Sequence, residues 1–189
     1  MPKRNPDRRA ERTRLALMAA FIELLLTRGY EALTAGEISH KANVGRSTFY
    51  LHYAGKEELL RVSMQIPSNQ MAACIGADFA PWRLAPLLDH FWEQRTVNRA
   101  FFADPIRSLW VKCLAAVIEP RLTCTARTGG GRSEVPRSLV ALMIAEMQIA
   151  LIAHWVTNRF SLKSELIAAT LVANTHAMLG VLGHSDRIN

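Results

Sequence analysis

The sequence has little that would support catalysis. Its three cysteines and six histidines show no metal-ligand spacing, and no HExxH pattern occurs. The three glycines at 129–131 lack the Lys-Ser/Thr pair and the preceding strand of a phosphate-binding loop. No pairing of a nucleophile with a base is recognisable either. We therefore predict no metal, no cofactor and no catalytic residue.

Cysteine is scarce and odd in number, which argues against a disulfide framework. Cys74, Cys113 and Cys124 are expected to be free thiols in a reducing, cytoplasmic compartment. A free cysteine is usually a small buried hydrophobe, and a redox-sensing thiol is the alternative.

Alternating strand-like runs are also missing, while helical periodicity runs through the whole chain. Together with 50% hydrophobic and 21% charged residues, this predicts an all-α globular protein. The segment 136–160 is apolar almost all round and would need partners on several sides. A membrane span is the rival interpretation, and Glu146, Gln148 and His154 within it argue against that.

The net charge of +7, from 23 basic and 16 acidic residues, is concentrated at the start of the chain. Residues 1–14 contain six basic and two acidic side chains, which contributes +4. We expect a flexible basic arm over residues 1–8 that becomes helical near Arg8 or Arg9 and lies along phosphates. A merely solubilising terminus is the alternative. No signal peptide is expected, because Glu23 interrupts the amphipathic segment after the arginines.

Residues 34–60 predict two short helices joined by a tight turn. Thr34 with Glu37 forms a capping-box pattern, so a helix is expected from Ala35 to about residue 42. Asn43 tolerates positive φ at the turn, and Gly45 frees the entry to the second helix. Two helices in this arrangement are typical of proteins that read duplex DNA.

The second helix has an apolar face and a polar face. Phe49 and Tyr53 lie four residues apart and are expected to pack against Ile38. The remaining faces carry side chains suited to phosphates, base edges and the thymine methyl group. These residues are Arg46, Ser47, Thr48, Tyr50, Leu51 and His52.

Over about the first 60 residues the chain resembles the TetR/AcrR family of bacterial transcription regulators. The resemblance rests on matching positions Phe21, Gly29, Tyr30, Thr34, Ile38, Ala42, Val44, Thr48, Tyr50, His52, Lys56 and Leu59. It implies that Arg46, Ser47 and Tyr50 approach bases, and that Thr34, Thr48, Tyr50, His52 and Lys56 hold phosphates. With Ala35 and Leu51, these residues complete the predicted DNA-binding set.

This sequence departs from the family pattern at four positions: Gly36, Ser39, Asn43 and Gly45. Gly36 stands where some members carry a base-reading arginine, so the operator sequence does not transfer. Gly45 replaces a common Ser or Thr cap, which should cost only a few tenths of a kcal/mol.

The resemblance implies two domains, a DNA-binding domain over 1–61 and an effector-binding and dimerisation domain over 62–189. Pro67 should interrupt the helix that begins at Lys56. In the family, the last two helices pair across a homodimer, and here they correspond to about 136–160 and 161–182. The two recognition helices would then meet a near-palindromic double-stranded DNA operator one turn apart.

The resemblance also implies a small-molecule pocket in the second domain, with an apolar or aromatic effector of unknown identity. Aromatic, methionine and polar side chains are the candidates, although each is equally an ordinary core or surface residue. The predicted ligand-binding residues are Met64, Met71, His90, Phe91, Gln94, Trp110, Cys113, Met147 and His154.

The sequence as a whole indicates a ligand-responsive, sequence-specific repressor and not an enzyme. Two alternatives remain open. A non-specific architectural DNA-binding protein would also keep the basic arm, and a helical small-molecule-binding enzyme is the less favoured alternative.

Overall fold

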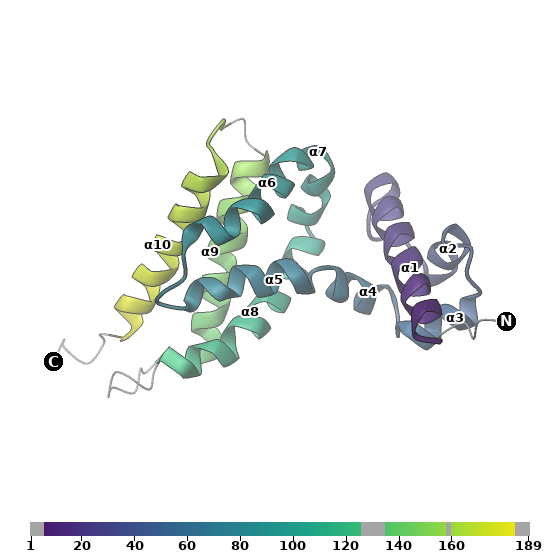
Figure 1. The fold of residues 1–189 in the computed structure, drawn as a ribbon, viewed down its shortest axis with the longest axis horizontal. Helices are drawn as coiled ribbons and strands as arrows, with labels where there is room; N and C mark the ends of the chain where they lie inside the picture. The colour runs from purple at the N-terminus through teal and green to yellow at the C-terminus, as the bar shows by residue number, and fades with distance from the viewer. Residues whose placement is uncertain (1–5, 126–134, 158–159, 184–189) are drawn as a thin grey trace. The chain divides into compact units, whose positions relative to one another are not determined.

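The computed structural model describes residues 6–125, 135–157 and 160–183, and within them every regular element is a helix (Figure 1). This confirms the all-α prediction. The chain divides into two compact units, Met1–Ser63 and Met64–Asn189, which we call the N-unit and the C-unit. The sequence placed this boundary between residues 61 and 62. The glycine-rich segment around 129–131 lies outside the described residues.

The N-unit is a bundle built around its first helix. Its helices are α1 (Pro6–Arg28), α2 (Ala35–Lys41), α3 (Arg46–His52) and α4 (Lys56–Ser63). Helix α1 ends where Gly29 adopts a φ of 76°, a left-handed conformation that glycine reaches without steric cost.

The buried stripe of α1 includes Leu17, Phe21 and Leu25, all at most 1% exposed. Helical periodicity in the sequence predicts a buried stripe of Leu15, Met18, Phe21, Ile22 and Leu25. The prediction is right for Phe21 and Leu25 and wrong for Leu15, whose side chain is 64% exposed. The stripe follows the i, i+4, i+8 spacing from Leu17, which turns Leu15 away from the core.

The predicted interruption near Pro67 is confirmed. Helix α4 ends at Ser63, and α5 (Gln65–Ala72) begins two residues later, with Pro67 in its first turn. Proline is tolerated there because the first amides of a helix have no acceptor within the helix.

The C-unit packs its long helices around α9 and α10. Besides α5, it contains α6 (Ala85–Glu93), α7 (Arg95–Asn98), α8 (Ile106–Thr125), α9 (Arg137–Thr157), α10 (Ser164–Gly183), and the 3₁₀ turns η1 (Ala73–Ile75), η2 (Pro81–Leu84) and η3 (Arg99–Phe102). Helix α8 packs against α5 and α9, while α10 packs against α6, α9 and the turn η2.

The aromatic-rich segment 87–102 has the pattern of one long helix in the sequence, but in the structure that helix is broken. Helix α6 ends at Glu93, and α7 and η3 follow as separate short turns. The buried Asn98 side chain donates to the backbone carbonyl of Phe91 at 3.3 Å. An asparagine that bonds to backbone in this way competes with regular helical bonding.

Helix α9 provides the central packing surface of the C-unit. Its inner side chains Ile144, Ile149 and Ile152 are fully buried. Among the described residues, α9 is the one helix long and apolar enough to cross a membrane by length and composition, and half of its most apolar window is buried within the protein. A buried core helix of a globular protein has the same composition.

An aromatic cluster fills the C-unit beside α8. Trp110 lies 5.8 Å from Phe91 and 5.2 Å from Phe102, measured between ring centroids. Its indole N–H donates to the hydroxyl of Ser68 at 3.1 Å, and both residues are at most 2% exposed. A buried indole N–H needs such an acceptor.

One of the three cysteines, Cys74, is the small buried hydrophobe that the sequence suggested. Cys74 is buried, and its burial raises the pKa of the thiol to about 12. At neutral pH its reactive thiolate form is therefore scarce. Cys113 is half-buried, and the side chain of Cys124 lies outside the described set.

Removing the acceptor for Trp110 should destabilise the C-unit. Ser68→Ala leaves the buried indole N–H unpaired, and we expect the free energy of unfolding to fall by about 1–3 kcal/mol. Urea unfolding followed by tryptophan emission measures this, because all four tryptophans lie in the C-unit. Ser138→Ala, at an exposed position of α9, is the control and should change stability by less than about 0.5 kcal/mol. Equal losses in the two variants would contradict the assignment.

Candidate functional site

The turn between α2 and α3 is fixed by backbone hydrogen bonds. The amide of Val44 donates to the carbonyl of Ser39 at 2.9 Å, and that of Asn43 donates to His40 at 3.1 Å. Asn43 has a φ of 53°, which confirms the predicted left-handed turn. These bonds fix where α3 begins relative to α2.

A capping box starts α2, as predicted. The Thr34 hydroxyl accepts a hydrogen bond from the Glu37 amide at 3.2 Å, and the Glu37 carboxylate accepts one from the Thr34 amide at 3.0 Å. The hydroxyl also donates to that carboxylate at 2.9 Å, and Arg28 forms an ion pair with it at 2.8 Å. The Thr34 hydroxyl proton, predicted to face a phosphate, is thus already used inside the N-unit.

Helix α3 is held by its apolar side. Phe49 is fully buried and Tyr53 is 5% exposed, and their ring centroids lie 6.0 Å apart. Ile38 on α2 is also fully buried. Gly45 occupies the N-cap of α3 in extended geometry without a side-chain hydrogen bond, so packing determines how this helix lies.

The other side of α3 faces outward, and we call it the recognition face: Arg46, Ser47, Thr48, Tyr50, Leu51 and His52. Tyr50 is 50% exposed and Leu51 is 82% exposed. Thr48 and His52 are half-buried, while Arg46 and Ser47 are exposed. Two adjacent large side chains with this much apolar surface in water are more favourable when another molecule covers them, so this part of α3 suits a binding contact.

Arg46 is the cation of this face. Its guanidinium lies 5.9 Å from the centroid of the Tyr50 ring, one helical turn away. The ion pairs found among the described residues do not include Arg46. Its charge is therefore available to a phosphate or to the acceptors of a guanine.

Lys56 has a role that the sequence did not reveal. Its ammonium donates to the carbonyls of Tyr30 and Glu31 at 3.1 and 3.4 Å and lies 4.5 Å from the Tyr30 ring centroid. It thus ties the start of α4 to the segment after α1. Burial raises the pKa of Tyr30 to about 12, so this ring stays neutral beneath the lysine.

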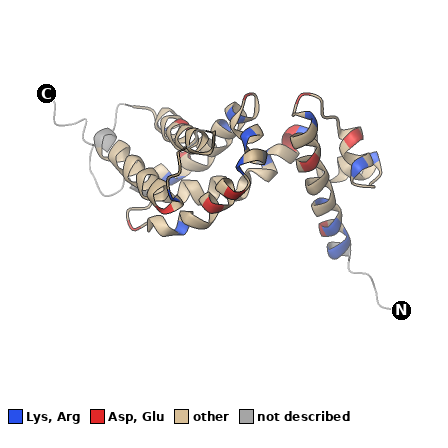
Figure 2. Cartoon of the chain, turned by 90° about the horizontal axis from the view of Figure 1, so that it is seen from above, with Lys and Arg blue, Asp and Glu red and all other residues tan. Residues whose placement is uncertain are grey.

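The basic arm is shorter than predicted. The chain is already helical at Pro6, the first residue described, so 6–8 belong to α1. Proline suits the first turn of a helix. The blue residues in the first half of α1 are arginines: Arg8, Arg9, Arg12 and Arg14 (Figure 2). Residues 1–5 lie outside the described residues.

The predicted ligand-binding residues do not form one group. Phe91 and Trp110 meet in the aromatic cluster, and Met64 and Met71 are also buried. Cys113 and Met147 are half-buried. The polar candidates are instead exposed, so they do not point into this core: His90, Gln94 and His154.

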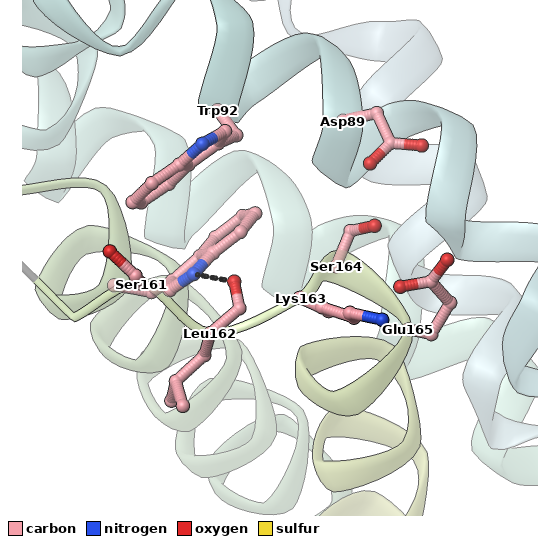
Figure 3. Close-up of a pocket in the computed structure, with 8 residues that line it drawn as sticks. Asp89, Trp92, Ser161, Leu162, Lys163, Ser164 and Glu165 are labelled. Atoms are coloured by element: carbon pink, nitrogen blue, oxygen red, sulfur yellow. Dashed lines mark hydrogen bonds between the residues drawn. The ribbon is translucent and has the colours of Figure 1, made fainter.

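Two neighbouring clefts in the C-unit involve none of those candidates. One, of about 450 Å³, is lined by Asp89, Trp92, Trp155, Ser161, Leu162, Lys163, Ser164 and Glu165 (Figure 3). The other, of about 390 Å³, is lined by Trp92, Arg95, Thr96, Arg99, Val156, Thr157 and Ser161. Trp92 is one of the aromatic residues that the sequence offers as a pocket lining, whereas Arg95 and Arg99, three and seven residues after it, are the signal that sequence reasoning passed over.

A capped helix, a fixed turn and a second helix with an exposed polar face define a helix-turn-helix DNA-binding protein. Residues 17–62 match the model for bacterial regulatory proteins of the tetR family. Over 60 residues the chain is 48% identical to an uncharacterized HTH-type transcriptional regulator, YxbF, of Bacillus subtilis (strain 168). That match covers 31% of this chain and 16% of the relative's length.

Solved structures extend the likeness over both units. A TetR transcriptional regulator from Streptococcus agalactiae 2603V matches with a TM-score of 0.58 and 25% identity, covering 89% of this chain and 96% of that one. Thermus thermophilus FadR, a TetR-family repressor, matches with a TM-score of 0.54 and 18% identity, covering 86% and 93%. Residues 17–62 thus match the DNA-binding part of tetR-family regulators, and both units share the fold of solved TetR-family regulators.

The Glu37 carboxylate makes the stability of the N-unit depend on pH. Hydrogen bonds from Thr34, assisted by the nearby Arg28, lower the pKa of Glu37 below its usual value. Its stabilising contribution is therefore complete above the pKa of the unfolded chain and is lost as pH falls through the lower folded-state pKa. Glu37→Gln should be less stable than the wild type at pH 7, and the difference should shrink in acid.

Urea unfolding followed by circular dichroism between pH 3 and 7 measures that difference. Glu31→Gln removes an exposed carboxylate that forms no hydrogen bond with the described residues, and its stability should track the wild type. A Glu37→Gln deficit that stays constant down to pH 3 would disprove the linkage.

Proposed function

We propose that this regulator is a ligand-responsive repressor that binds a specific, near-palindromic DNA operator as a homodimer. The observation that carries the proposal is the recognition face, which presents an unpaired arginine, hydroxyls, an exposed tyrosine and an exposed leucine on a helix anchored from behind by Phe49. The protein would act in the cytoplasm, where its DNA target lies.

Base reading would come from the N-terminal half of α3. Arg46, Ser47 and Tyr50 are the residues assigned to base edges, because helix-turn-helix proteins place the first turns of the second helix in the major groove. Thr48 and His52 would hold phosphates, and Lys56 would do so with the one ammonium donor not bound to the Tyr30 and Glu31 carbonyls. At the start of α2 the phosphate contact would come from the backbone amide of Ala35, because the Thr34 hydroxyl already donates to Glu37. Leu51 is placed to touch a thymine methyl group.

Dimerisation would use the outer sides of α9 and α10. Leu139, Leu142 and Met143 are 40–46% exposed and lie on one side of α9 at i, i+3 and i+4. Leu166 on α10 is 53% exposed. Leaving these side chains in water is unfavourable, and a two-fold dimer would bury them against their own copies.

The effector would be a small apolar or aromatic molecule held in the C-unit. A solved structure of the same fold, Thermus thermophilus FadR, is in complex with lauroyl-CoA, whose acyl chain is apolar. In this chain the buried Gln148 side chain keeps an oxygen without a hydrogen-bond partner, which is a polar anchor inside an apolar core. An effector releases the operator only if it binds more tightly to the conformation that binds DNA poorly.

Sequence selection tests the DNA-binding proposal. Duplexes retained from a random library at near-physiological salt should share a two-fold symmetric motif. Retention without a motif would instead support a non-specific architectural protein.

Arg46→Ala should relax the selected motif at one base pair per half-site, at a cost of about 1–3 kcal/mol there. The matched control is Arg61→Ala, which removes an equal charge from α4, where Arg61 pairs with Glu58 at 3.4 Å. That variant should keep the motif. An unchanged motif for Arg46→Ala would remove this residue from the base-reading set.

Met143→Glu tests the dimer. A charge placed on the outer stripe of α9 should convert the dimer into monomers, measured by sedimentation at micromolar concentration. Ile66→Glu, at a 71% exposed apolar position on α5, is the control and should remain dimeric. A monomeric wild type, or a dimeric Met143→Glu variant, would refute the assigned surface.

A further inference from the structure

The second cleft of the C-unit, which we call the arginine cleft, has an unusual charge composition. Of its seven lining residues, two are arginines and none is acidic. Arg95 and Arg99 lie four residues apart on consecutive turns, so both side chains reach the same opening. Thr96, Thr157 and Ser161 add hydroxyl groups.

Both guanidinium groups are held by the ends of helices. Arg95 Nη1 donates to the carbonyl of Trp92 in the last turn of α6 at 3.1 Å. Arg99 Nη2 donates to the carbonyl of Thr157, the last residue of α9, at 2.9 Å. Each of these bonds uses one of the five N–H donors of its guanidinium, which leaves donors on both groups for a ligand.

Neither guanidinium is neutralised by a carboxylate of the described chain, in contrast to Arg107, which pairs with Glu146. The hydrogen bonds to helix-end carbonyls give each arginine a structural role. They do not account for the presence of two positive charges without a carboxylate partner beside the same cleft. An anion placed between them would receive charge-assisted hydrogen bonds from both.

One wall of the cleft is a fixed aromatic surface. The indole of Trp92 stacks on that of Trp155 with centroids 5.0 Å apart and an interplanar angle of 19°. Trp155 is itself fixed by donation from its N–H to the carbonyl of Leu162 at 3.0 Å (Figure 3). Arg95 lies 4.9 Å from the centroid of the Trp92 ring. The half-buried Trp92 forms the edge of this stack and offers a ligand apolar contact beside Arg95 and Arg99.

We propose that the arginine cleft binds a small organic carboxylate, with its carboxylate between Arg95 and Arg99 and its apolar body against Trp92. A planar carboxylate matches the fork of a guanidinium, and the indole adds a contact that an inorganic anion cannot use. This site shares no residue with the predicted core pocket and does not depend on DNA binding.

The test uses the full-length wild-type protein and a panel of monocarboxylates: benzoate, phenylacetate, indole-3-acetate and octanoate, each paired with its neutral amide. Isothermal titration measures affinity. For the ligands that do not absorb, a change in total tryptophan emission that is absent from Trp92→Phe reports occupancy. At least one acid should bind, and its amide should bind at least tenfold more weakly. Inorganic phosphate at the same concentration should not displace it.

Arg95→Gln and Arg99→Gln should each weaken binding of that acid at least tenfold. Arg99→Lys, which keeps the charge but loses the fork, should weaken it less than Arg99→Gln does. The matched control is Arg83→Gln, because Arg83 also lies beside an indole, 5.7 Å from the centroid of exposed Trp82, but lines neither cleft. It should bind like the wild type.

Thermal unfolding of each variant shows whether the loss of a helix-capping arginine has unfolded the C-unit, and only folded variants are compared. The proposal is overturned if no acid of the panel binds, if an amide or phosphate binds as tightly, or if both glutamine variants keep wild-type affinity.

Discussion

The N-unit depends on the burial of a few apolar side chains beneath two very short helices. Helices α2 and α3 have seven residues each, and isolated helices of that length are not stable in water. Phe49, Ile38 and Phe21 are fully buried, and their burial supplies the free energy that local propensity does not. The capping box and the turn at Asn43 then determine where each helix begins.

Local chemistry explains why the sequence predicts the N-unit well. The Thr34 and Glu37 cap, the left-handed Asn43 and the inward pair Phe49 and Tyr53 each act within a few residues, so the spacing alone carries the information. The hydrogen bond from the Lys56 ammonium to the Tyr30 carbonyl joins residues 26 positions apart. No pattern of nearby residues predicts it. Lysine there is compatible equally with solvent, DNA and a backbone carbonyl.

In the C-unit the sequence predicts the long helices but not their interruptions. The ends of α9 and α10 fall close to the predicted bounds because these helices are strongly apolar. The break after Glu93 depends on the buried Asn98, whose environment is created by tertiary packing. The ligand-binding candidates were chosen by residue type, and type alone did not separate the buried Trp110 from the exposed His90.

Gly45 leaves the first turn of the recognition helix without a side-chain cap, although the turn before it is fixed by backbone hydrogen bonds. Without a side-chain cap, the first amides of α3 lack an acceptor on the N-cap, whereas the far end is held by Phe49 and Tyr53. Local opening of the first turn therefore requires less free energy than opening of the rest, and its amide hydrogens exchange with solvent sooner. The end of the helix that faces outward is thus the end whose backbone can still adjust.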